Sequence, residues 1–169
     1  TGFNNTAIGR SAMYNNLTGS FNVAIGKFAA TQTKSNSNTA IGFEALACNT
    51  TGCFNVAIGK DALKANTTGI NNAAIGTDSL RANTIGTGNT AMGHIALNAN
   101  TTGCNNTAVG LNALCTLTVG NRNTAVGRNS LLNMSGSGDR NNTAIGYAAG
   151  SSVSTGFNLT LLGYGAEPS

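Results

Sequence analysis

A short motif returns along the whole chain at a nearly constant spacing. In nine of its ten copies it reads Asn, then Thr, Val or Ala, then Ala, then Ile, Val or Met, and it closes on Gly. The closing glycines are Gly9, Gly26, Gly42, Gly59, Gly76, Gly93, Gly110, Gly127, Gly146 and Gly163. Seven of the nine steps between them are 17 residues, one is 16 and one is 19. Such a period is typical of repeat proteins, in which each repeat stacks on the next.

The motif predicts a strand. It is too short for a helix, ends in a helix breaker, and carries a branched residue before the closing glycine. The Thr-Thr-Gly-x-Asn stretch between copies has the composition of a tight turn. One such coil cannot bury its own apolar face, but stacking at the ~4.8 Å strand spacing joins the faces into a core. The sequence therefore predicts an all-β fold, a parallel β-solenoid or β-roll of ten coils of about 17 residues.

The register is continuous, so we expect one repeat domain over residues 1–169 and one uninterrupted rod. It shifts only at Ser35-Asn36-Ser37, the short step, and at Ser135–Asp139, where the long step predicts a protruding loop. Because the chain begins inside a repeat at Thr1-Gly2, we expect a fragment of a longer protein.

Two adjacent apolar columns favour assembly of several copies. The Ala at the centre of each motif is followed by a larger apolar residue: Ile8, Ile25, Ile41, Ile58, Ile75, Met92, Val109, Val126, Ile145 and Leu162. Neighbouring residues of a strand face opposite sides, so one column lines the coil and the other faces out. We expect a thin interior filled mainly by Ile/Val and Leu. A long exposed apolar stripe is uncommon, so the outward column favours a symmetric oligomer, although alanines tolerate exposure in a monomer.

Asparagines form two further columns. One contains Asn5, Asn22, Asn38, Asn55 and Asn72 and continues to Asn142, and the other contains Asn49, Asn66, Asn83 and Asn100. Stacked amides can hydrogen-bond along the axis of a rod, so the columns predict structural amide ladders. The alternative is a regular polar surface that binds carbohydrate or ice.

The titratable residues do not form a catalytic constellation, so we expect no enzyme, no catalytic residues, no cofactor and no metal. His94 is the single histidine, and we expect neither a histidine-rich metal site nor a catalytic triad. Glu44, Asp61 and Asp78 share a column and could form a weak cation site. The stronger interpretation pairs Asp61 with Lys64 and Asp78 with Arg81, three residues further on.

The cysteines and glycosylation sequons leave alternatives open. Cys48 and Cys53 flank a turn and could form a disulfide, but the favoured interpretation is that most of the four cysteines, which include Cys104 and Cys115, are small residues that fill Ser- or Ala-sized positions. Sequons at Asn49, Asn66 and Asn100 follow from an Asn/Thr-rich repeat, and they matter only if a eukaryotic host secretes the protein.

The charge pattern argues against two classes of partner. The net charge is +4, but no two basic residues are adjacent, whereas a nucleic-acid-binding protein usually has a clustered basic stripe. No apolar run approaches the roughly 18 residues of a membrane span. We therefore expect neither a nucleic-acid partner nor insertion into a membrane.

The motif resembles those of two fibre families. Asn22–Gly26 and Asn55–Gly59, both Asn-Val-Ala-Ile-Gly, resemble head repeats of trimeric autotransporter adhesins. Thr1–Gly9 and Thr102–Gly110 resemble the repeats of phage tail-fibre and related fibre proteins, and this likeness covers nearly the whole chain. It implies a left-handed homotrimer. Asn158–Ala166 looks like the last coil before a C-terminal domain, which in such fibres is often a self-cleaving trimerisation chaperone.

The repeat and the resemblance together predict a structural or adhesive segment, a rigid trimeric shaft or head on a virion or cell surface. Its expected partners are its own copies and a glycan or protein receptor. One alternative is an ice- or carbohydrate-binding solenoid that uses the rows Thr50-Thr51, Thr67-Thr68 and Thr101-Thr102, which are interrupted at Leu117–Val119 and around Lys34. A polysaccharide-cleaving solenoid is disfavoured because no acids cluster.

Overall fold

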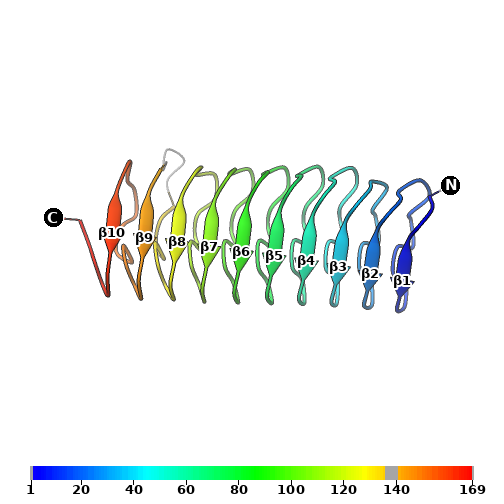
Figure 1. Ribbon diagram of the computed structural model, residues 1–169, viewed down its shortest axis with the longest axis horizontal. Helices are drawn as coiled ribbons and strands as arrows, with labels where there is room; N and C mark the ends of the chain where they lie inside the picture. Colours follow the sequence, from blue (N-terminus) through cyan, green and yellow to red (C-terminus); the bar gives the residue numbers. More distant parts are fainter. Residues whose placement is uncertain (1, 136–140, 169) are drawn as a thin grey trace.

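The computed structural model describes residues 2–135 and 141–168, and it is an all-β parallel solenoid of about nine turns (Figure 1). Ten strands of three residues form a single sheet in chain order, each parallel to the next. The strands are β1 (Thr6–Ile8), β2 (Val23–Ile25), β3 (Thr39–Ile41), β4 (Val56–Ile58), β5 (Ala73–Ile75), β6 (Thr90–Met92), β7 (Thr107–Val109), β8 (Thr124–Val126), β9 (Thr143–Ile145) and β10 (Thr160–Leu162). The predicted fold and coil length are confirmed.

Pairing keeps every motif in register despite the two irregular steps. Ala24 pairs with Ala40 across the short step, and Ala125 pairs with Ala144 across the long one. The sheet therefore continues from β1 to β10 over about 43 Å, taking nine steps of the usual strand spacing. The loop predicted at Ser135–Asp139 lies mostly outside the described residues.

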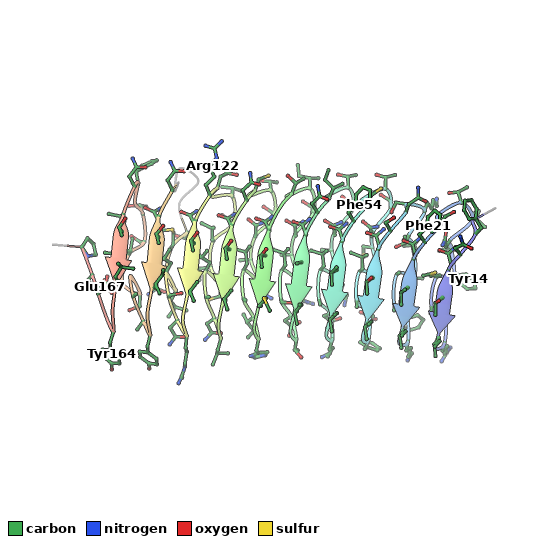
Figure 2. The ribbon with its side chains drawn as sticks, in the orientation of Figure 1. Tyr14, Phe21, Phe54, Arg122, Tyr164 and Glu167 are labelled. Atoms are coloured by element: carbon green, nitrogen blue, oxygen red, sulfur yellow. The ribbon has the colours of Figure 1, made fainter. Side chains whose placement is uncertain are left out.

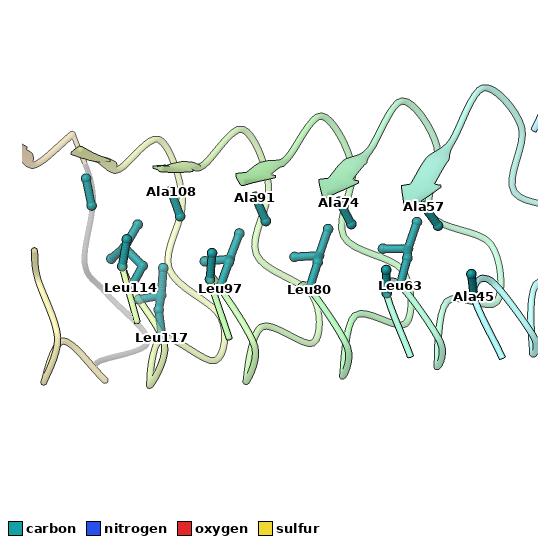
Figure 3. Packing of buried hydrophobic residues seen from close by; sticks show 14 of the residues in the cluster. Ala45, Ala57, Leu63, Ala74, Leu80, Ala91, Leu97, Ala108, Leu114 and Leu117 are labelled. Atoms are coloured by element: carbon teal, nitrogen blue, oxygen red, sulfur yellow. The ribbon is translucent and has the colours of Figure 1, made fainter. Parts of the chain in front are cut away.

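The interior is lined by alanine, leucine and asparagine, and the expectation that Ile and Val would fill it was wrong. The central Ala of each strand from Ala24 to Ala144 is fully buried, whereas the residues on either side of it face outward. In Figure 3, Ala57 and Ala74 point from the sheet toward Leu63 and Leu80 on the opposite wall. The two walls lie so close that one leucine fills the gap and leaves room for only a methyl group on the sheet side.

The closing glycines are required by the stacking. From Gly9 to Gly163 they have φ between 117° and 138°, a region that side chains rarely adopt. A Cβ placed on any of them from Gly9 to Gly146 would lie under 3.0 Å from the glycine of the next coil. Gly163 has nothing within 4 Å of that position, because no described coil follows it. The glycine column therefore reflects both the backbone conformation and the close approach of successive coils.

Non-glycine residues also take left-handed backbone at three corners of most coils. In the coil around β4 these are Phe54 (φ 59°), Asp61 (φ 56°) and Leu63 (φ 51°). This conformation costs an ordinary residue roughly 1–2 kcal/mol. At Leu63 full burial of the side chain contributes about 1.5–3 kcal/mol and offsets that cost.

The predicted amide ladders are confirmed. In the first, the side-chain amide of Asn72 donates to Oδ1 of Asn55 (3.2 Å) and to the carbonyl of Gly86 (2.9 Å), while its Oδ1 accepts the backbone N–H of Asn89 (3.0 Å). The same pattern joins successive asparagines from Asn5 to Asn142. These buried amides thus tie each coil to both of its neighbours.

The second ladder is shorter. It runs from Asn49 through Asn66 and Asn83 to Asn100, with side-chain contacts of 2.8–2.9 Å. Leu117 takes the next place in the column, and Oδ1 of Asn100 is left buried without a hydrogen-bond partner. The interior therefore changes from polar to apolar at this column, after about two thirds of the rod.

Candidate interface on the outer face of the sheet

The outward side of the sheet is an uncharged surface along the rod. We call it the outer face and define it as the first and third residue of each strand, from Thr6 and Ile8 to Thr160 and Leu162. None of these residues is buried, and none is charged. The third positions hold only Ile, Val, Met and Leu, and the exposed fraction reaches 57% at Ile8 and 64% at Leu162. Because the sheet is continuous, these side chains form one apolar stripe.

Two rims border the outer face. The upstream rim comprises the residues five and six places before each closing glycine, where the chain enters the strand. The downstream rim comprises the residue directly after each closing glycine. In Figure 2 the upstream rim carries Phe21, Phe54 and Arg122 along the upper edge of the sheet, and Tyr164 marks the downstream rim along the lower edge.

Exposed large apolar side chains concentrate on this side of the molecule. The described residues include sixteen exposed large apolar side chains, and thirteen of them lie on the outer face or its rims. They are Phe3, Phe21, Phe54, Ile70 and Phe157 on the upstream rim, Ile8, Met92, Ile145 and Leu162 on the face, and Phe43, Leu111, Tyr147 and Tyr164 on the downstream rim. An extended apolar surface of this kind is typical of a protein–protein contact.

Aromatic and cationic groups contact one another along each rim. Phe3 and Phe21 meet edge to face at 5.3 Å, and Tyr147 and Tyr164 stack at 5.2 Å. Arg128 lies 5.7 Å from the centre of the Tyr147 ring. These contacts are fixed by the coil spacing, which places equivalent rim residues in adjacent coils next to each other.

The acidic column lies away from the outer face and is paired with cations. Lys64 contacts both Glu44 and Asp61, the latter at 3.3 Å, and Arg81 lies 3.4 Å from Asp78. The predicted pairing is confirmed. The hydrogen bond with Glu44 is the main reason that the pKa of Lys64 is raised, against the opposing effect of partial burial. Among the described residues no three His, Cys, Asp or Glu side chains gather as a metal site would require.

His94 and the cysteines belong to no metal-type cluster among the described residues. His94 is exposed on the downstream rim. All four cysteines are free, so the disulfide considered between Cys48 and Cys53 is not formed. Cys48 is exposed, whereas Cys115 is half-buried, and burial raises the pKa of its thiol.

The structure also places the sequons and threonine rows. Asn49, Asn66 and Asn100 are fully buried, so their side chains are inaccessible to a glycosylating enzyme in the folded chain. The Thr50, Thr67, Thr84 and Thr101 hydroxyls each donate to the threonine carbonyl of the next coil at 3.0–3.1 Å. The first threonine of each pair therefore bonds within the stack, whereas the second threonines, Thr51, Thr68 and Thr102, are exposed.

Comparison with protein-family models, with curated proteins and with solved structures finds no match to this chain. The described residues contain no helix of the length and apolarity needed to cross a bilayer. The outer face and its rims are therefore the candidate functional site, and the choice depends on their geometry alone. Its apolar column is predicted by the sequence, but the rim aromatics that border it are not, because the corner positions vary from coil to coil.

Proposed function

We propose that the chain is a rigid segment of an extracellular or virion-surface fibre, a shaft or head assembled as a homotrimer through the outer face. The observation that carries the proposal is the uncharged apolar stripe that follows the sheet from β1 to β10. Covering this stripe with identical stripes from other copies removes apolar surface from water, at about 25 cal/mol per Å².

The size of the face fits an interface between copies. It is about 43 Å long and about 20 Å wide between the rims, from the strand spacing and the rise per residue. That corresponds to about 850 Å², close to the ~800 Å² per partner of a stable protein interface. Three copies around a common axis would each bury this face, and the resemblance to autotransporter heads and tail fibres supports three copies with left-handed coils.

The proposed mechanism is mechanical. Repeated hydrogen-bonded coils make the segment stiff, and stiffness lets it hold a binding tip away from the surface or contact a host directly. Its proposed external partner is a cell-surface glycan or protein. The glycine and asparagine columns act as structural residues in this proposal, since each is used to join one coil to the next.

A matched pair of substitutions tests the interface. Ile58→Asp places a carboxylate at the centre of the outer face, whereas Thr68→Asp places the same group at an exposed position away from it. Sedimentation should give a trimer for the parent chain and for Thr68→Asp, and a folded monomer for Ile58→Asp. Equal masses for the two variants would remove the outer face from the interface.

A second candidate rests on the same face. In the five C-terminal coils its first positions are all threonine, Thr90, Thr107, Thr124, Thr143 and Thr160. Rows of hydroxyl and methyl groups at one regular spacing favour ordered water, which is the requirement for binding ice. This candidate needs a monomer, because assembly through the outer face would cover the rows. A monomeric chain that leaves ice recrystallisation unchanged would eliminate it.

A further inference from the structure

In four of the ten coils the two rims carry matched residues. Phe3 and Arg10 belong to the first coil, Phe21 and Lys27 to the second, and Phe54 and Lys60 to the fourth. The tenth coil has Phe157 on the upstream rim and Tyr164 on the downstream rim. Each pair has a phenyl ring on one rim and a cation or a second ring on the other.

Members of a pair cannot meet within one chain. Phe54 and Lys60 lie on either side of β4, at opposite edges of the sheet, and their six-residue separation spans at most about 20 Å at the strand rise. Two side chains of this length do not bridge that gap. The paired rim residues therefore do not contact each other within one chain.

The matched residues can contact each other between copies that run in the same direction around a common axis. In a closed ring with their outer faces inward, the upstream rim of each copy meets the downstream rim of the next at the same coil. We propose that these seams are closed by contacts between the rims, chiefly a cation–π contact between Phe54 of one copy and Lys60 of the next. This inference rests on the trimer advanced under Proposed function and specifies its direction and register.

The fourth coil distinguishes parallel copies from antiparallel ones. Phe54 is 61% exposed, and the side chain of Lys60 is also 61% exposed, with its ammonium 3.8 Å from Asp61. In an antiparallel pair the upstream rims would meet each other, and Phe54 of the fourth coil would face Asn105 of the seventh. A parallel ring gives Phe54 a cation instead, in the geometry in which a lysine ammonium and a ring attract each other.

The other three matched coils are less decisive because one rim ring in each already contacts a ring of a neighbouring coil. Phe3 contacts Phe21, and Lys27 lies 5.8 Å from the centre of the Phe43 ring. The other six coils lack the match, and in the eighth Arg122 and Arg128 occupy the two rims. Arg128 is directed toward Tyr147 of the next coil.

Disulfide trapping tests the seam. All four native cysteines are first replaced by serine, and the mass of this background is checked against the parent chain. Phe54→Cys with Lys60→Cys is then oxidised mildly and run on a denaturing gel without reductant. The proposal expects a covalent trimer. Phe54→Cys with His94→Cys, two coils out of register, should remain monomeric on the gel.

Each outcome decides a different point. If the parent chain has the mass of one copy in solution, the proposed trimer is refuted. An oligomer that is trapped through Phe54→Cys with Asn105→Cys, but not through Phe54→Cys with Lys60→Cys, overturns the parallel seam and leaves the assembly standing. An oligomer trapped by neither pair overturns the rim contact.

A double-variant cycle in the native cysteine background gives an independent measurement. Phe54→Ala and Lys60→Met should be non-additive, with a coupling of roughly two- to fivefold in the dissociation constant per seam, the size of an exposed cation–π contact. Strict additivity would count against the contact even if the cysteine-free background fails to assemble.

Discussion

Replacing Asn72 with alanine should be among the most destabilising single changes in the rod, although it lies in no catalytic or apolar cluster. Asn72 is 1% exposed, and its side chain takes part in four hydrogen bonds, two donated and two accepted. Alanine would also leave the buried backbone N–H of Asn89 without its acceptor. Gly86 keeps a donor in Asn83, and Asn89 keeps the carbonyl of Gly103, so only this one N–H is orphaned.

These losses define the expected magnitude. Each of the four hydrogen bonds contributes about 1 kcal/mol net, and an orphaned buried donor costs a further 1–3 kcal/mol, so we expect about 5–7 kcal/mol in total. Chemical denaturation followed by far-UV circular dichroism measures the change. Native-state hydrogen exchange should place the loss at β5 and β6, because each coil contacts only its neighbours.

The matched control is Asn71→Gly in the same coil. Asn71 is exposed at φ 58°, a conformation that glycine adopts without strain. This variant should change the free energy of unfolding by less than about 1 kcal/mol. If Asn72→Ala is no more destabilising than Asn71→Gly, the idea that buried amides hold successive coils together is refuted.

Three further changes probe the stack, the core and the C-terminal coil. Gly76→Ala should lower the free energy of unfolding by more than about 3 kcal/mol, because a Cβ there meets the backbone of Gly93. Gly163→Ala has the same unfavourable φ without the clash, so it should lower the free energy of unfolding by about 1–3 kcal/mol in the same denaturation assay. Leu80→Ala removes a fully buried side chain and should cost about 2–5 kcal/mol, against less than about 1 kcal/mol for Ile85→Ala, which is half exposed; equal midpoints would contradict a packed interior. Burial opposes ionisation of Glu167, but hydrogen bonds from Ser152 and Ser151 outweigh it and lower its pKa, so its contribution is complete above the unfolded pKa and is lost as the pH falls through the folded pKa. Protection of the Ser152 amide from hydrogen exchange, corrected for intrinsic rate, should therefore fall on acidification in the parent chain and stay constant in Glu167→Gln.

The sequence predicted the solenoid, its coil length and its register because these follow from periodicity alone. Period-17 spacing of Gly and Asn is visible without coordinates, and stacking turns identical positions into columns. The amide ladders were predictable for the same reason, since a column of asparagines in a stacked fold places each amide beside the next.

The orientation of the strand could not be read from the same pattern. Ala57 and Ile58 are both apolar, so alternation identifies two faces without saying which is inside. The distance between the walls decides it, and that distance depends on Leu63, whose left-handed backbone is not a preference that leucine shows locally. The grouping of the rims with the outer face was likewise hidden, because those positions follow no common residue type.

The most direct test of the central claim is the mass of the native chain by size-exclusion chromatography with light scattering. One copy has a mass of 16.9 kDa, so three copies give about 51 kDa, three times that value. The expected result is the larger mass, that of three copies. A single folded species at the mass of one copy, with the outer face open to solvent, would contradict it.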